Sequence, residues 1–425
     1  MKRIQGGAKA LFLFSVVAAV GGIWGGVSLW KRAGEASAST YLGDHKQLLN
    51  KDDLAKALQG TGVFHELPSE IDLTLDGKLE KDVVQYAFDP KLQEAMESLF
   101  DVYRPDYGSF VAIDAATGRV LSMVSYTHRH DIDQHLALKA TFPSASVFKV
   151  VTAAAAIAER NFSGSTVIPF NGRNHTLYRS AILKTQINRW TRYMTLKEAF
   201  ARSVNTVFAR IGAFNVGPEE MRDYAGRFGF NRRIASDMPM EQGSAAITND
   251  VWHLAEASSG FTKENTMSPM QGALIAATIV NDGVMMEPYV VDSVHRQDGT
   301  KIYGAQPRVS ATSVSPQTAQ EIRSLMRETV RRGTSRGSFR GFSRSRYGFV
   351  DVGGKTGSLT GLAPRGKYDW FVGFAEFGGQ KIAVAALTVH EKFWRVKSSY
   401  LARRSFEAFF RDKLGPQTRV ALRRH

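Results

Sequence analysis

Ser146 and Lys149 lie three residues apart at the start of a helical pattern that runs to residue 160. Residues at this spacing share one face of a helix, so the Ser146 hydroxyl and the Lys149 amine can meet. A serine hydroxyl is a poor nucleophile without a neighbouring base. A lysine amine can act as that base if burial and a nearby cation lower its pKa. The pair therefore predicts a serine nucleophile with a lysine base, although a capping serine beside a solvated lysine has the same spacing.

Ser203 and Asn205 form a second candidate pair, inside a helical pattern at residues 195–214. Residues two apart do not share a helix face, so the two side chains converge only if the helix ends or breaks there. At such a break Ser203 could relay a proton, and Asn205 could hold a substrate amide or the lysine. A helix-capping serine is the alternative interpretation.

A third candidate group lies in a strand predicted at residues 349–359 and consists of Lys355, Thr356, Gly357 and Ser358. A lysine and two hydroxyls on one strand edge would suit a substrate carboxylate, and Gly357 would let the substrate backbone approach that edge. A nucleotide-binding phosphate loop is excluded, because Phe349 stands where its first glycine is required.

The elements that must position these residues follow from periodicity and turn signals. A hairpin is predicted from strands at residues 109–113 and 119–124, and late strands at 349–359, 370–377 and 381–389. Helices are predicted at residues 89–100, 146–160, 195–214, 218–228, 269–281, 315–331 and 398–412. An early hairpin, a helical middle and late strands predict one α+β body whose two ends share a sheet.

Taken together and in this order, the three groups resemble the S-x-x-K, S-x-N and K-T-G set of penicillin-binding proteins and serine β-lactamases. The likeness to a penicillin-binding protein transpeptidase domain covers roughly residues 106–412. It implies a β-lactamase/transpeptidase-like α+β fold, with an antiparallel five-stranded sheet flanked by helices and an all-α subregion. Two departures are Val204, where aspartate is common, and Ser144 ahead of the nucleophile.

The resemblance also implies a mechanism. Ser146 would attack the penultimate D-Ala of a peptidoglycan stem peptide, with Lys149 as base, and penicillins would acylate the same serine. The implied catalytic residues are Ser146, Lys149, Ser203, Asn205 and Lys355, and the implied substrate-binding residues are Thr356, Gly357 and Ser358. No cofactor and no metal are implied. The expected activity is that of a peptidoglycan D,D-transpeptidase.

Three other functions remain open at this point. A D,D-carboxypeptidase would use the same acyl-enzyme and water. A serine β-lactamase shares the three groups, but the chain has no E-x-x-L-N stretch after the second group that could supply a deacylating glutamate. A β-lactam-binding scaffold or sensor would keep the residues without turnover.

The N-terminal part of the chain predicts a membrane anchor. Residues 10–30 are 21 uncharged residues, and a helix that crosses a bilayer needs about 20. A cleaved signal peptide is the alternative, since residues 36–38 resemble a cleavage site, but its hydrophobic run is usually shorter, at about 7–15 residues. We therefore expect a single-pass protein of the plasma (inner) membrane with its catalytic domain outside the cytoplasm.

The expected domain organisation follows from these assignments. Residues 1–32 would form a cytoplasmic tip and transmembrane anchor, 33–105 a linker and small lead-in module with a strand at 71–75, 106–412 the transpeptidase domain, and 413–425 a basic tail. The lead-in module is too short for a glycosyltransferase domain, so a separate glycosyltransferase is the expected partner. The other expected partners are peptidoglycan stem peptides, β-lactam antibiotics and the membrane.

Charge and composition exclude some other classes of protein. The chain has no cysteine, which excludes disulfides, thiolate nucleophiles and cysteine-rich zinc sites. Its formal charge is +15, and six arginines fall within residues 331–346. No RNA-binding signature accompanies them, so we expect a flexible basic surface loop and no nucleic acid. Residues 128–135 contain three histidines and two aspartates, which could bind zinc, but a polar loop at the rim of the site is the preferred interpretation.

Overall fold

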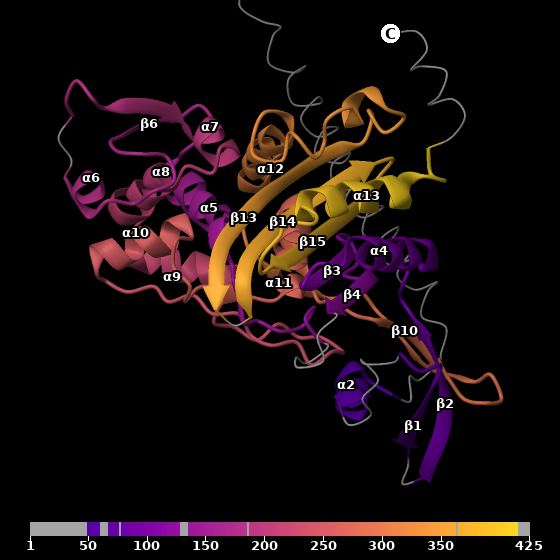
Figure 1. Cartoon of the computed structure of the whole chain (residues 1–425). Helices are drawn as coiled ribbons and strands as arrows, with labels where there is room; N and C mark the ends of the chain where they lie inside the picture. The colour runs from indigo at the N-terminus through magenta and orange to yellow at the C-terminus, as the bar shows by residue number, and fades with distance from the viewer. Residues whose placement is uncertain are drawn as a thin grey trace, which may run out of the picture. The chain divides into compact units, whose positions relative to one another are not determined.

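The computed structural model describes residues 49–59, 67–75, 78–127, 135–184, 187–362 and 364–414 (Figure 1). The predicted anchor and nearly all of the predicted basic tail lie outside these residues. Within the described ranges, no helix has the length and apolar character that crossing a membrane requires.

A five-stranded antiparallel sheet forms the centre of the body. Its order is β13 (Asp351–Leu362), β14 (Arg365–Phe377), β15 (Gln380–His390), β3 (Tyr107–Asp114) and β4 (Val120–Thr127). The early hairpin joins the late strands where Val111 pairs with Ala385, in the middle of the β15–β3 ladder. The prediction that the two ends of the α+β body share one sheet is therefore confirmed.

Helices cover both faces of this sheet (Figure 1). Side chains alternate along β3, so Phe110 and Ala112 belong to one buried cluster, whereas Val111 and Ile113 belong to the other. One face carries α11 (Pro269–Val280), and the other carries α4 (Pro90–Tyr103) and α13 (Ser398–Phe410). Every residue of α11 is buried, as expected for a helix that is apolar on all sides.

Three helices begin within one residue of the start predicted from the sequence. Asp89, Ser268 and Ser315 each precede a proline and accept a hydrogen bond from the backbone N–H three residues further on, at 3.1, 3.1 and 3.2 Å. They open α4, α11 and α12 (Pro316–Arg331), respectively. The cap satisfies a free N–H, and proline lacks the N–H that would otherwise stay unpaired.

A helical subregion follows the turn that carries Ser146, the predicted nucleophile. It consists of α5 (Lys149–Arg160), α6 (Arg179–Leu183), α7 (Leu196–Ala201), α8 (Asn205–Arg210), η2 (Ile211–Val216), α9 (Pro218–Arg227) and α10 (Val251–Ser259). Two predicted helices are wrong in detail. A 3₁₀ turn, η1 (Ala145–Phe148), precedes α5, and the helix predicted at residues 195–214 is broken at Ser203. Periodicity detects an apolar face but not a local break, because both segments keep that face buried.

A smaller sheet has the order β1 (Glu70–Leu75), β2 (Lys78–Tyr86), β10 (Val291–His295) and β11 (Lys301–Gly304). Just before helix α2 (Lys51–Gln59), the backbone N–H of Leu49 donates to Ile302 O of β11 at 3.2 Å, which attaches this end of the helix to the sheet. The remaining short strands pair as β5 (Phe142–Pro143) with β8 (Thr266–Met267), β6 (Val167–Phe170) with β7 (Arg192–Thr195), and β9 (Val284–Met286) with β12 (Val309–Thr312). Since β2 pairs with β10, residues assigned to the lead-in module share a sheet with residues of the main body, and the boundary between them stays a prediction.

Candidate active site

Neighbouring backbone groups fix the turn that carries Ser146. Trp370 Nε1 donates to the carbonyl of Pro143 at 2.9 Å, and the backbone N–H of Ser144 donates to Asn265 O at 2.7 Å. A Cβ atom added at Gly260 would come 1.9 Å from the carbonyl oxygen of Ala145. The turn is therefore held from β14, from the segment before β8 and from the end of α10.

Gly357 brings strand β13 against the same turn. A Cβ atom at this position would lie 3.2 Å from Val147 Cγ2 and 3.3 Å from Ser144 O, both tighter than ordinary contact. The sequence interpretation explained Gly357 by the approach of substrate. The structure adds that the turn carrying Ser146 crowds this position, so glycine also sets the distance between Ser146 and the strand edge.

Lys149 lies beneath Ser146 and is completely buried. Its Nζ donates to Ser146 Oγ at 2.7 Å, to Asn205 Oδ1 at 2.7 Å and to the carbonyl of Ser259 at 2.5 Å. Burial, and after it the charge of Lys355, hold the pKa of Lys149 well below its usual value. A lysine that loses its proton readily next to a serine hydroxyl has the properties of a general base.

The helix break between α7 and α8 turns Ser203 and Asn205 toward the two lysines. Ser203 has a φ of 55°, in the left-handed region, which ends α7 and lets α8 begin at Asn205. Ser203 Oγ accepts a hydrogen bond from Lys355 Nζ at 2.9 Å. Because Ser203 and Asn205 lie two residues apart, their side chains can converge only at a helix break such as this one. Val204 is fully buried in the hydrophobic core, which explains why an apolar residue fits between them.

Lys355 is also completely buried, on β13. Besides Ser203, its Nζ contacts the carbonyl of Thr356 at 2.7 Å and lies 5.6 Å from the centre of the Phe200 ring. Burial lowers the pKa of Lys355 to about 7. No carboxylate of the described residues forms a salt bridge with Lys355 or Lys149, so an anionic substrate group would not have to displace one.

The polar side chains next to the two lysines are accessible to solvent. Ser146, Asn205 and Thr356 are half-buried, and Ser358 is exposed. The five predicted catalytic residues form two hydrogen-bonded groups, Lys149 with Ser146 and Asn205, and Lys355 with Ser203. The predicted substrate-binding residues continue along the β13 edge. The arrangement provides a nucleophile, a buried amine beside it and a cation next to surface hydroxyls, which together suit acyl transfer from a substrate with a carboxylate.

Three further residues reach the site without a sequence signal. The Thr334 hydroxyl lies 2.5 Å from that of Thr356, and Ser259 contributes only its carbonyl. His175 receives a hydrogen bond on its carbonyl from Asn205 Nδ2 at 2.8 Å. Burial first, and then the charges of Lys149 and Lys355, lower the pKa of its imidazole, which therefore lies near both lysines. These residues could not be predicted, because neither a backbone carbonyl nor a single histidine in a loop belongs to a recognisable sequence motif.

The metal alternative has no support in the part of the chain that the structure describes. No group of three or more histidine, aspartate or glutamate side chains there could hold an ion. Most of the histidine-rich segment, residues 128–134, lies outside the described residues.

Comparison with known proteins agrees with this geometry. The family model of the penicillin binding protein transpeptidase domain matches residues 108–411. A curated relative, peptidoglycan D,D-transpeptidase PbpA of Mycolicibacterium smegmatis, is 29% identical over 346 residues. That match covers 74% of this chain and 66% of the relative, so the chain spans slightly less than two thirds of the relative's length.

Solved structures resemble the chain over most of its length. The D,D-transpeptidase domain of a peptidoglycan glycosyltransferase from Eggerthella lenta is 25% identical, with a TM-score of 0.66 over 80% of this chain and 85% of that one. Penicillin-binding protein A from M. tuberculosis, as an imipenem acyl-enzyme complex, is 26% identical, with a TM-score of 0.62 over 77% and 80%. The fold is therefore the β-lactamase/transpeptidase-like α+β fold predicted from the sequence.

Proposed function

The chain belongs to the penicillin-binding protein transpeptidase family, and we propose that it is a peptidoglycan D,D-transpeptidase that works through an acyl-enzyme on Ser146. The observation that carries the proposal is the 2.7 Å hydrogen bond between Ser146 Oγ and the Nζ of a completely buried Lys149. The relative named peptidoglycan D,D-transpeptidase and the acyl-enzyme complex of a related protein support the same activity.

In the first step, Ser146 Oγ attacks the carbonyl of the penultimate D-Ala while Lys149 takes the hydroxyl proton. An ester bond forms, the peptide C–N bond breaks, and the terminal D-Ala leaves with a proton. Lys355 and Ser203, which share a 2.9 Å hydrogen bond, form the route by which that proton reaches the leaving amine. Asn205 Oδ1 accepts from Lys149 and its Nδ2 donates to the carbonyl of His175, which leaves the second N–H of the amide to orient the donor peptide.

The strand edge binds the substrate in this mechanism. Thr356 and Ser358 donate to the terminal carboxylate, and the charge of Lys355 attracts it. The backbone N–H groups of Ser146 and Ser358 stabilise the tetrahedral oxyanion, an interaction worth about 3 kcal/mol per donor in enzymes of this kind.

In the second step an amine from a neighbouring strand attacks the ester. A new amide forms, the ester C–O bond breaks, and Ser146 recovers its proton as the amine loses one. Water in place of the amine would give carboxypeptidase activity.

The rate of penicillin acylation is expected to fall as the pH rises above about 7. The pKa of Lys355 is lowered to about 7, so above that pH the lysine loses the positive charge that attracts the β-lactam carboxylate. The second-order rate constant, measured with a fluorescent penicillin from pH 5 to 9, should show this decline. In Lys355→Arg the decline should disappear, because arginine keeps its charge throughout this range. An undiminished rate up to pH 9 in the wild type contradicts the role of Lys355.

A direct test of the activity uses a stem pentapeptide that ends in D-Ala-D-Ala, with the full chain in detergent and an acceptor amine. Mass spectrometry is expected to show a product in which the terminal D-Ala is replaced by the acceptor. A product shortened by D-Ala alone would instead identify a carboxypeptidase. Rapid multiple turnover of nitrocefin would identify a β-lactamase, and binding without any product would identify a scaffold.

The remaining proposals concern the domain boundaries of the chain, its location in the cell and a partner enzyme. We place an anchor and cytoplasmic tip at residues 1–32, the lead-in module at 33–105, the catalytic domain at 106–412 and the tail at 413–425, as in the sequence prediction. The catalytic domain then faces the outside of the plasma membrane, where peptidoglycan is assembled. A separate glycosyltransferase supplies the glycan strands.

A further inference from the structure

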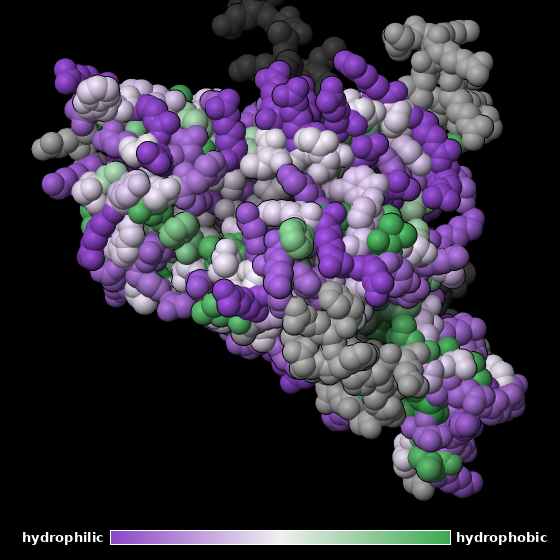
Figure 2. All heavy atoms as spheres, viewed as in Figure 1, coloured by the Kyte–Doolittle hydropathy of each residue, from purple (hydrophilic) through white to green (hydrophobic). Residues whose placement is uncertain are grey.

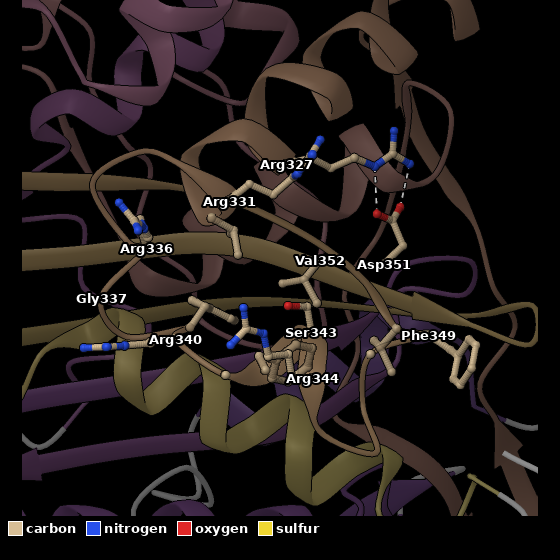
Figure 3. Close-up of a pocket in the computed structure, with 16 residues that line it drawn as sticks. Arg327, Arg331, Arg336, Gly337, Arg340, Ser343, Arg344, Phe349, Asp351 and Val352 are labelled. Atoms are coloured by element: carbon tan, nitrogen blue, oxygen red, sulfur yellow. Dashed lines mark hydrogen bonds and ion pairs between the residues drawn. The ribbon is translucent and has the colours of Figure 1, made fainter. Parts of the chain in front are cut away.

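A basic pocket lies at the start of β13, in the segment that connects α12 to this strand. Its volume is about 1100 Å³, and its cationic lining consists of Arg327, Arg331, Arg336, Arg340 and Arg344 (Figure 3). The pocket belongs to the same edge strand as Lys355. Val352, the lining residue nearest Lys355 along the strand, is about 10 Å of strand from it, at ~3.3 Å per residue, and no lining residue is one of the predicted site residues, so the pocket is distinct from the candidate active site.

The connecting segment is folded and is not the loose loop predicted from its composition. Phe339 and Phe342 are each only 5% exposed and pack in the cluster between the sheet and α13. Arg403 of α13 donates to the carbonyls of Ser338 and Arg340, at 3.1 and 3.2 Å. The inward-facing phenylalanines and these bonds fix the backbone that carries the arginines.

The outward arginines recur every fourth residue, at 336, 340 and 344, and all three are exposed. Among the described residues, their guanidinium groups have no ion-pair or hydrogen-bond partner. Asp351 is the only acidic residue of the lining, and Arg327 already binds it through two hydrogen bonds of 2.7 and 2.5 Å (Figure 3). The lining therefore has a formal charge of +4, with three guanidinium groups available to a ligand.

Apolar side chains alternate with the arginines around the pocket. They are Val330, Phe339, Phe342, Phe349, Val350 and Val352. Figure 2 shows hydrophilic side chains gathered over α12 and the segment after it. Four of the apolar lining residues are buried, namely Phe339, Phe342, Val350 and Val352, and Val330 is half-buried. Phe349, 49% exposed at one end of the pocket, is the apolar group most open to solvent.

We propose that this pocket binds the phosphate headgroup of an anionic lipid, with the adjoining hydrocarbon against Phe349 and Val330. Guanidinium groups bind phosphate through paired hydrogen bonds, and the alternating apolar groups suit an amphiphile better than a simple ion. Nucleic acid fits less well, because successive bases stack on several exposed aromatic rings, whereas of the three phenylalanines in the lining Phe339 and Phe342 are buried and Phe349 alone is exposed.

The test uses the full chain in a nonionic amphipol, so that no free micelles absorb the probe. Dihexanoyl phosphatidylglycerol below its critical micelle concentration is titrated by calorimetry, beside dihexanoyl phosphatidylcholine and inorganic diphosphate. The phosphatidylglycerol is expected to bind at least about tenfold more tightly than either of the others. The triple variant Arg336→Gln/Arg340→Gln/Arg344→Gln should weaken that binding by at least about tenfold, because it removes charge-assisted hydrogen bonds.

A matched variant, Arg232→Gln/Arg233→Gln/Arg308→Gln, removes the same charge from exposed positions outside the pocket and should bind like the wild type. Penicillin labelling of Ser146 should be unchanged in both variants, which separates this proposal from the proposed function. Equal binding of diphosphate and phosphatidylglycerol would overturn the amphiphile assignment. An equal loss in the matched variant, or no binding of the lipid at all, would also overturn the proposal. A single-stranded oligonucleotide is titrated in parallel, and its binding in place of the lipid would have the same consequence.

Discussion

Ser146→Ala is expected to abolish covalent labelling by a fluorescent penicillin. Alanine has no hydroxyl to open the β-lactam ring, and the lysine beneath it is completely buried and cannot take over as nucleophile. Removing a catalytic serine typically lowers the rate by on the order of 10⁶. Gel fluorescence after incubation of equal amounts of folded protein measures the effect, and the variant should give no band above background.

Ser144→Ala is the matched control for this experiment. Ser144 lies on the same turn, and its buried Oγ has no hydrogen-bond partner among the described residues. Loss of a hydroxyl without a partner should cost little stability, so this variant should be labelled like the wild type. Equal labelling of wild type and Ser146→Ala would refute the nucleophile assignment.

Lys149→Met is expected to have the second-largest effect, a decrease of about 10²–10⁴ in the acylation rate constant. Methionine is unbranched and of similar length, so it can fill the buried site, but it cannot take the proton of Ser146 Oγ. It also removes the amine that joins Ser146, Asn205 and the carbonyl of Ser259. Stopped-flow measurement of penicillin acylation gives the rate constant, and thermal unfolding verifies that the variant is folded.

The pH dependence of the acylation rate constant distinguishes a lysine that acts as the base from a lysine with only a structural role. Because the pKa of Lys149 is held well below its usual value, the wild-type rate should rise with pH as this amine loses its proton, until the decline expected from Lys355 above about pH 7 begins. The residual rate of Lys149→Met should lack this rise. The exposed replacement Lys184→Met serves as the control and should leave rate and profile unchanged. A Lys149→Met variant that keeps the wild-type rate would contradict the assignment.

Much of the fold could be predicted because the signals are local. The caps at Asp89, Ser268 and Ser315 each involve a side chain and a backbone N–H three residues away, so a short stretch of sequence contains both partners. The strands of the central sheet were found from runs of apolar residues. The short strands β6, β7, β9 and β12 were not predicted, because three or four residues provide no periodicity.

The basic segment before β13 shows where composition misleads. Its glycines, serines and arginines are typical of a mobile loop, but Phe339 and Phe342 find buried positions against α13 and the sheet. Burial of aromatic rings stabilises an ordered backbone, and their partners lie far away in the sequence.

By itself, the sequence determined the family, the order of the three groups and the identity of the residues that could carry acyl transfer. Only the tertiary structure decided that these residues meet. Ser203 approaches Lys355 across 152 positions, and Lys149 approaches Asn205 across 56. The structure also decided that both lysines are buried, and burial is what lowers their pKa values. The physical reason is that desolvation depends on all the atoms packed around an amine, which come from segments distant in the chain.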